Sequence, residues 1–157
     1  MSRPVAHPRA PRSTTVAFAA AVALGFVVFA GCGAPVAVTP PPDVPSVCGD
    51  LQQALPKRVE GQERRPTTPE SSATAAWGDP PMVLVCGVST PAAYNSTSSL
   101  LDITGVSWFA EPLSAGVRFT TIGRVANVEF TVPDAYSPEA YPLIDLASAI
   151  ATTVPKI

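Results

Sequence analysis

Carboxylate side chains are the groups in this sequence with the clearest capacity for acid–base chemistry. A pair of them can act as general acid and general base when a cleft holds both and separates their pKa values. No spacing in the sequence brings two of them together. A small carboxylate-dependent hydrolase or transferase is therefore our second hypothesis, behind a non-enzymatic binding module. The five candidates are Asp79, Asp102, Glu111, Glu129 and Asp145.

Histidine chemistry is excluded once the N-terminal segment is removed. The single histidine, His7, precedes the predicted cleavage site, so the mature chain contains none. This rules out Ser-His-Asp and Cys-His catalysis and every histidine-based zinc site. The glycines form neither a GxGxxG pattern nor a P-loop, so nucleotide binding has no support. We accordingly expect no catalytic residues of these kinds, no cofactor and no metal.

Cys32 follows a segment that is typical of secretion signals. Three arginines and no acidic residue precede residues 16–30, which are fifteen apolar or small residues without a charge. This length suits the apolar core of a signal peptide and is short for a membrane span. The sequence "FAGC" at 29–32 then resembles a bacterial lipobox, whose cysteine receives a diacylglycerol thioether. We predict a lipoprotein signal peptide at residues 1–31 and lipidation of Cys32.

An uncleaved membrane anchor is the alternative interpretation of the same segment. The apolar character continues as far as Val38, and a tilted helix could use that length, although Pro35 weakens the case. On both interpretations the basic end lies in the cytoplasm and the remaining chain lies outside the membrane. We therefore expect a cell-membrane protein of the envelope whose domain is extracytoplasmic.

Cys48 and Cys86 are the two cysteines left after lipidation of Cys32. An even pair in an oxidising compartment predicts a disulfide bond. The chain-entropy estimate for a loop of about 39 residues is about 4 kcal/mol, a large share of the stability of a small domain. The alternative is two buried free thiols.

The charge balance and the proline content indicate how the mature chain is organised. Of ten Lys and Arg residues, three precede Cys32, which leaves seven against twelve acids and a net charge of −5. This balance disfavours a nucleic-acid partner. Residues 32–45 are rich in proline and predict a polyproline-like tether, which at about 3.1 Å per residue would hold the domain about 40 Å from the bilayer.

Two amphipathic helices are predicted near the ends of the domain at residues 46–157. Ser46 can cap the first helix, and Pro56 ends it. Pro142 suits the first position of the second helix, which Pro155 ends. The apolar positions that repeat at helical spacing in the second helix are Leu143, Leu146, Ala147, Ile150, Ala151 and Val154.

Strands are predicted between the two helices. Residues 72–77 and the continuous apolar run at 82–88 read as strands, and residues 100–109 as another with a bulge at Gly105. Residues 57–70 are predicted as an edge strand or a loop, because two prolines interrupt them. Here we interpret the basic pair Arg64 and Arg65 as a solvated strand end in preference to an anion site.

A β-hairpin is predicted around Gly123 and Arg124. Glycine at the first central position favours a type II′ turn. The resulting register places Phe119 opposite Val128 and Arg118 opposite Glu129, with one face apolar and the other polar. The Arg118 and Glu129 side chains would then form a surface ion pair.

The fold class that these elements predict is α+β. We expect a single small domain with a mostly antiparallel sheet of about four or five strands, two helices packed on one face, and a disulfide bond.

Several short segments, taken in order, resemble an actinobacterial family of uncharacterised secreted or membrane-anchored proteins, the domain of unknown function 3515 (DUF3515). The resemblance covers nearly the whole predicted domain and implies family membership and an envelope location. It implies no catalytic residues that could be transferred. The segments are "ALP" at 54–56, "RRPT" at 64–67, "TAAWGDPP" at 74–81, "CGV" at 86–88, "GVSWF" at 105–109, "FTTIGR" at 119–124, "VP" and "YSP" at 132–138, and "PLIDLASAI" at 142–150.

The function expected from these features is a non-enzymatic, membrane-anchored module that binds a protein partner or a cell-wall component. Its surface is predicted at loops and turn tips, at Trp77, Asp79, Trp108 and Arg124. The alternatives are that both tryptophans lie in the core or at a sheet edge, and that Arg124 is solvated. Binding of a small ligand between the sheet and the helices is a third possible function.

Overall fold

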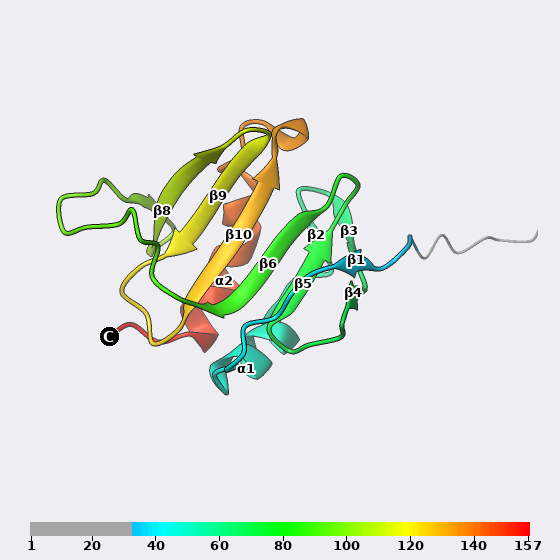
Figure 1. Ribbon diagram of the computed structural model, residues 1–157, viewed down its shortest axis with the longest axis horizontal. Helices are drawn as coiled ribbons and strands as arrows, with labels where there is room; N and C mark the ends of the chain where they lie inside the picture. Colours follow the sequence, from blue (N-terminus) through cyan, green and yellow to red (C-terminus); the bar gives the residue numbers. More distant parts are fainter. Residues whose placement is uncertain (1–32) are drawn as a thin grey trace, which may run out of the picture. The chain divides into compact units, whose positions relative to one another are not determined.

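The structure, a computed structural model, describes residues 33–157 and forms two layers, a β-sheet and a pair of helices (Figure 1). The predicted signal peptide and Cys32 lie outside the described residues. Helix α1 spans Val47–Ala54 and helix α2 spans Pro142–Thr153. A short 3-10 helix, η1, spans Asp134–Tyr136. Within residues 33–157, neither helix is long and apolar enough to span a membrane.

The main sheet contains eight strands in the order β2-β3-β5-β6-β10-β9-β8-β7, and all neighbouring pairs are antiparallel. A second sheet pairs β1 with β4 in parallel. The strands are β1 (Val36–Ala37), β2 (Arg58–Val59), β3 (Gln62–Arg65), β4 (Thr67–Thr68), β5 (Thr74–Trp77), β6 (Met82–Val88), β7 (Leu101–Ile103), β8 (Val106–Leu113), β9 (Gly116–Thr121) and β10 (Asn127–Pro133).

The α+β class, the mostly antiparallel sheet and the disulfide bond are confirmed, but the prediction of four or five strands is wrong. Two segments that were each predicted as one strand or loop are hairpins of two strands, which the hydrophobic pattern did not distinguish. In the first, β2 and β3 join at Glu60 and Gly61, which both have positive φ. In the second, Thr104 and Gly105 have φ values of 53° and 77° and form the turn between β7 and β8. Gly105 is therefore a turn residue and not a bulge.

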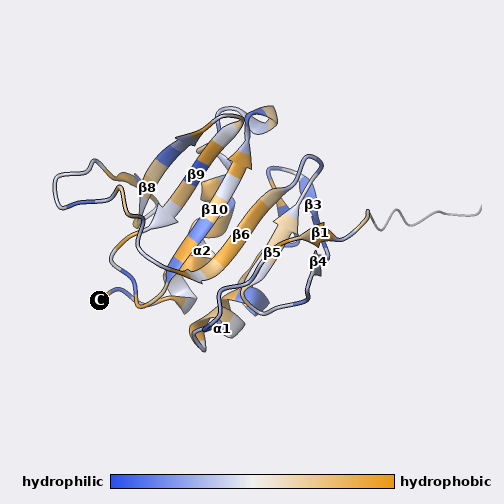
Figure 2. Cartoon of the chain, in the orientation of Figure 1, coloured by the Kyte–Doolittle hydropathy of each residue, from blue (hydrophilic) through white to orange (hydrophobic). Residues whose placement is uncertain are grey.

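The main core lies between the sheet and the two helices. Every second residue of the strands points toward the helices and packs against the apolar faces of α1 and α2. In Figure 1, helix α2 runs behind the sheet. Its largest buried side chains are Trp77, Trp108, Phe130, Leu51, Met82, Leu84, Leu143, Leu146 and Ile150. Figure 2 shows β6 as largely hydrophobic and β3 as hydrophilic, as expected of a central and a near-edge strand.

Both helices occur close to their predicted positions. Pro142 is the first residue of α2, where its missing N–H removes no hydrogen bond. Ser46 precedes α1, but its side chain makes no capping hydrogen bond, so that detail of the prediction is wrong. Ala151, predicted on the apolar face of α2, is exposed, whereas Ala149 is buried.

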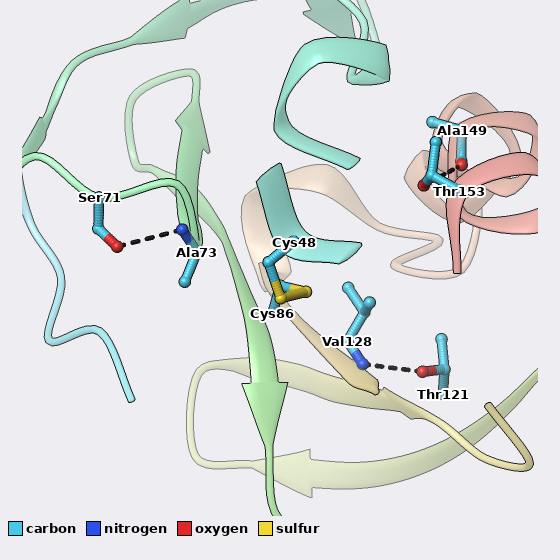
Figure 3. Close-up of a disulfide and its surroundings, with 8 residues drawn as sticks. All are labelled: Cys48, Ser71, Ala73, Cys86, Thr121, Val128, Ala149 and Thr153. Carbon is cyan, nitrogen blue, oxygen red and sulfur yellow. Dashed lines mark hydrogen bonds between the residues drawn. A yellow bond between two sulfur atoms is a disulfide. The ribbon is translucent and has the colours of Figure 1, made fainter. Parts of the chain in front are cut away.

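The disulfide bond links Cys48 on α1 to Cys86 on β6 (Figure 3). The Cα atoms are 5.7 Å apart, and both residues are fully buried. The bond therefore fixes the first helix to a central strand of the sheet, as the cysteine count predicted.

The β9–β10 hairpin forms, but its predicted register is wrong by two residues. Phe119 pairs with Phe130 instead of Val128. The connection is longer than two residues because it bonds to the C-terminal segment: the Val125 N–H donates to the Pro155 carbonyl at 3.0 Å, and the Ile157 N–H donates to the Gly123 carbonyl at 3.2 Å. A shift of two residues leaves each side chain on its predicted face.

Residues 34–38, which we call the strap, pack on the domain and do not extend away from it as the predicted tether. The N–H groups of Val36 and Val38 donate to the carbonyls of Pro66 and Thr68 at 2.9 and 3.0 Å. Both valine side chains are buried against Ala76, while Ala37 between them is exposed. The alternation of the two valines matches the period of a strand, and this local pattern overrides the polyproline tendency of the surrounding prolines.

Candidate functional site

The site with the most complete set of polar groups is a pocket at the edge of the main sheet. Strands β3 and β5 pair at Arg64–Trp77 and Arg65–Ala76 and then diverge, because the chain after Pro66 turns to pair with the strap. The divergence leaves a cavity of about 680 Å³, which we call the edge pocket. It is lined by Gln52, Arg64, Arg65, Pro66, Thr67, Glu70, Ser71, Ser72, Thr74 and Ala75.

Side chains form hydrogen bonds along the edge of β5 where this strand is no longer paired with β3. The Gln52 amide of α1 donates to the Thr74 carbonyl at 3.2 Å, replacing a bond that a neighbouring strand would make. The hydroxyls of Thr67 and Thr74 are 2.9 Å apart and bridge the gap between β4 and β5. The Ser71 hydroxyl accepts from the Ala73 N–H at 3.1 Å (Figure 3). These bonds give the pocket defined walls.

Arg64 is the cation of the edge pocket that lies on the helix side of the sheet. Its guanidinium carbon lies 5.6 Å from the centre of the Trp77 ring, in a cation–π contact. It donates one hydrogen bond, a long one of 3.5 Å to the Gln52 carbonyl. Burial lowers the pKa of the Arg64 guanidinium below its ordinary value. The predicted solvated strand end is therefore wrong at this position, because the side chain is half-buried.

Arg65 lies on the opposite side of β3 and has structural partners. Its guanidinium donates to the carbonyls of Gly78 at 2.9 Å and Ala34 at 2.7 Å. It also lies 3.6 Å from the Asp79 carboxylate. Arg65 thus ties the strap and the turn after β5 to strand β3, and it is not a solvated strand end either.

Three of the four residues predicted as an interaction surface are buried. Trp77 and Trp108 are fully buried in the core, and Arg124 is 6% exposed. Asp79 is exposed, with its side chain 90% accessible. The structure therefore does not bring these four residues together on a surface. The alternative of core tryptophans is the correct one, because strand alternation points both indoles toward the helices.

Arg124 closes the C-terminal end of α2. Its guanidinium donates to the carbonyls of Ile150, Val154 and Gly105, at 3.4, 2.5 and 3.3 Å. The Val154 carbonyl lies past the last turn of α2 and has no later helical N–H to accept from, and a cation beside it also interacts favourably with the helix dipole. The alternative that Arg124 is solvated is therefore also wrong, and its function is structural.

The candidate catalytic carboxylates are largely engaged in local structure. Asp102 accepts from the Gly105 N–H at 3.0 Å in the β7–β8 turn, and Asp145 accepts from the Glu60 N–H at 2.7 Å. Glu129 lies 3.6 Å from Arg118, which confirms an ion pair, although Arg118 is directly opposite Thr131.

The surroundings of Glu129 shift the pKa of its carboxyl group. Burial raises the pKa of the Glu129 carboxyl, Arg118 opposes the rise, and Glu111 adds to it. Glu111 is paired with Arg118 across β8 and β9, so the two glutamates flank one arginine on the sheet face away from the helices. None of the five candidate carboxylates lines the edge pocket.

A second pocket, of about 490 Å³, lies between the chain after β6 and the β9–β10 connection, and its lining includes Tyr94, Ile122, Val125 and Ile157. Across the part of the chain that the structure describes, no group of three or more His, Cys, Asp and Glu side chains is placed to hold a metal ion.

Sequence reasoning missed most of the edge pocket. Gln52, Thr67, Ser71 and Thr74 carry no motif, and they come from a helix, a strand, a loop and another strand. The available signal was the Arg64–Arg65 pair directly before Pro66, because a proline in a strand commonly ends its pairing.

Comparison with known proteins identifies the family and no activity. The sequence model of one family, described as a protein of unknown function (DUF3515), matches residues 14–157. The chain therefore belongs to this family, as the short segments had indicated. No curated protein and no solved structure was found to match the chain.

Proposed function

We propose that this protein is a membrane-anchored, extracytoplasmic binding module without catalytic activity, and that the edge pocket is its binding site. The observation that carries the proposal is the pocket itself, a cavity of about 680 Å³ lined by hydroxyl, amide and guanidinium groups. Binding sites typically combine such a concave shape with a few fixed polar groups. The anchor and the location rest on the apolar segment at 16–30 and on Cys32.

The rigidity of the walls supports binding at this site. The disulfide bond fixes α1, which carries Gln52, to the sheet, and the strap fixes the chain from Pro66 to Thr68. A site whose side chains are held before the ligand arrives loses less conformational entropy on binding. The alternative, a carboxylate-dependent hydrolase or transferase, rests on the five candidate carboxylates, none of which lines the pocket.

Native mass spectrometry of the protein extracted from its own membrane in mild detergent tests the proposal. We expect the wild-type protein to retain an additional mass that denaturation removes. Ser72→Trp fills the edge pocket from an exposed position and should abolish that mass. Ser99→Trp, at an exposed position that does not line the pocket, is the matched control and should keep it. Retention of the mass in Ser72→Trp would contradict the proposed site.

A further inference from the structure

Arg64 differs from the other arginines of residues 33–157 in its partners. Arg58, Arg65 and Arg118 each lie within salt-bridge distance of a carboxylate. Arg124 donates to three carbonyl oxygens, two at the end of α2 and one in the β7–β8 turn. Among the described residues, Arg64 has no carboxylate within 4.0 Å and one long hydrogen bond to a carbonyl.

The burial of Arg64 makes this lack of an anion significant. A guanidinium that leaves water loses hydration, and the lowered pKa of Arg64 has the same cause. The Trp77 ring compensates one face of the cation. The Arg64 guanidinium donates a single hydrogen bond, to the Gln52 carbonyl. No Arg64 nitrogen is buried without a partner, so the remaining N–H groups are accessible in the pocket.

The surroundings hold this guanidinium in a defined orientation. Trp77 is fully buried, its indole N–H donates to the Pro56 carbonyl at 3.1 Å, and its ring contacts Phe130 edge-on at 6.1 Å. A guanidinium held over a fixed ring by a cation–π contact has less freedom to turn, so its N–H groups keep to a narrower range of directions. This arrangement suits a planar carboxylate, which accepts two parallel hydrogen bonds from a guanidinium.

The charges around the pocket favour a ligand with one negative charge. Arg64 supplies one unpaired positive charge, whereas the charge of Arg65 is opposed by Asp79. Glu70 also lines the pocket, and its negative charge opposes a doubly charged anion more strongly than a singly charged one. The hydroxyls of Thr67, Ser71 and Ser72 can bond to the rest of the ligand.

We infer that the edge pocket binds a small polar carboxylic acid whose carboxylate pairs with Arg64 through two parallel hydrogen bonds. The inference rests on the proposed function, since it names the ligand chemistry of the same pocket. The cavity of about 680 Å³ exceeds the size of a bare carboxylate, so the ligand has a body that the hydroxyl groups and Gln52 contact.

The test is a titration of the membrane-extracted protein in detergent, labelled with nitrogen-15 in arginine and tryptophan. The probe is N-acetylalanine, and its N-methylamide has the same body without the carboxylate. Inorganic phosphate is a third probe, at constant ionic strength. We expect N-acetylalanine to shift the Arg64 Nε signal in a saturable way, and the amide and phosphate to leave it unchanged.

Two arginine variants separate the ligand chemistry from the fold. In Arg64→Gln, the Trp77 indole signal should show binding weakened by about tenfold or more. In Arg58→Gln, which changes an exposed arginine outside the pocket, affinity should be unchanged. An unchanged Trp108 indole signal confirms that each variant keeps its core.

Three results would overturn the inference. The first is absence of a saturable Arg64 shift with N-acetylalanine up to its solubility limit, and the second is equal binding of the amide. The third is saturation by phosphate in place of the carboxylate. Each is distinguishable from failure of the binding site, because the loss of a bound mass in Ser72→Trp does not depend on ligand charge.

Discussion

Arg64 and Arg65 are adjacent in the sequence but have different partners in the structure. Successive residues of a strand point to opposite faces, so one arginine stacks on Trp77 and the other reaches the strap and Asp79. Their shared charge gives no indication of this difference. The distinct partners make Arg64 a candidate for ligand binding and Arg65 a structural residue.

Glu129 provides a prediction at the residue scale. Burial raises the pKa of the Glu129 carboxyl above the ordinary glutamate value of 4.5, so the folded state holds this proton more tightly than the unfolded state. The resulting contribution to stability is present at acid pH and is lost as the pH rises from 4.5 through the folded-state pKa. We expect Glu129→Gln to abolish this decline. The free energy of unfolding of the variant should therefore increase relative to that of the wild type between pH 4 and pH 7.

Urea unfolding at a series of pH values measures this effect, and Glu63 supplies a control of opposite sign. The hydrogen bond from Arg58 lowers the pKa of the Glu63 carboxyl, so its contribution is present above the unfolded-state pKa and is lost as the pH falls. The stability of Glu63→Gln should therefore fall relative to the wild type as the pH rises towards 4.5 and run parallel to it at higher pH, whereas Glu129→Gln departs from the wild type mainly above pH 4.5. A pH profile of Glu129→Gln parallel to that of the wild type would contradict the prediction.

At the scale of elements, the strap determines the shape of the edge pocket. It holds Pro66 and Thr68 through backbone hydrogen bonds on one side, while Pro66 and Thr67 line the pocket on the other. If this pairing were lost, the chain after β3 would have no partner to hold it away from β5. The N-terminal segment of the domain is thus part of the binding site that we propose, although none of its own residues lines the pocket.

Substitutions in the strap test its role. Val36→Asp with Val38→Asp places two carboxylates against Ala76 and removes the burial of two valines, at a cost of about 2–4 kcal/mol in the free energy of unfolding. Hydrogen exchange at residues 36 and 38 should become fast under native conditions. The matched control is Ala37→Asp, because this side chain lies in the same strand and is exposed. Equal urea midpoints for the two variants would show that the strap does not stabilise the domain.

For the molecule as a whole, we propose that the predicted anchor holds a small acidic domain at a membrane surface. The domain has a core between one sheet and two helices, with a disulfide bond across it. Placement outside the cytoplasm is consistent with the predicted secretion signal, and the disulfide bond fits an oxidising compartment.

The anchor is tested by the mass of the mature protein. We expect the protein from membranes to begin at Cys32 and to carry added acyl mass, with two hydrogens missing because Cys48 and Cys86 are bonded. Cys32→Ser should lack the acyl mass, whereas the double variant Cys48→Ser with Cys86→Ser should retain it. The same acylated species in Cys32→Ser, or a full-length chain in the wild type, would refute lipidation at this residue.

Features that depend on neighbouring residues were predictable from the amino-acid sequence. Proline at 142 and the apolar spacing after it predicted α2, and the run at 82–88 predicted the central strand β6. The cysteine count predicted the disulfide bond, and the order of short segments identified the family. These features follow from local geometry, from residue chemistry or from similarity, so no knowledge of distant contacts was needed.

The tertiary structure alone decided the strand pairing and the site. The register of β10, the docking of the strap and the burial of Arg124 each depend on hydrogen bonds to segments far along the chain, such as the bond from Val125 to Pro155. The edge pocket likewise joins α1, β3, β4 and β5 at a point where two strands diverge. Such contacts stabilise the protein only after distant segments of the chain have come together, and no local pattern in the sequence specifies them.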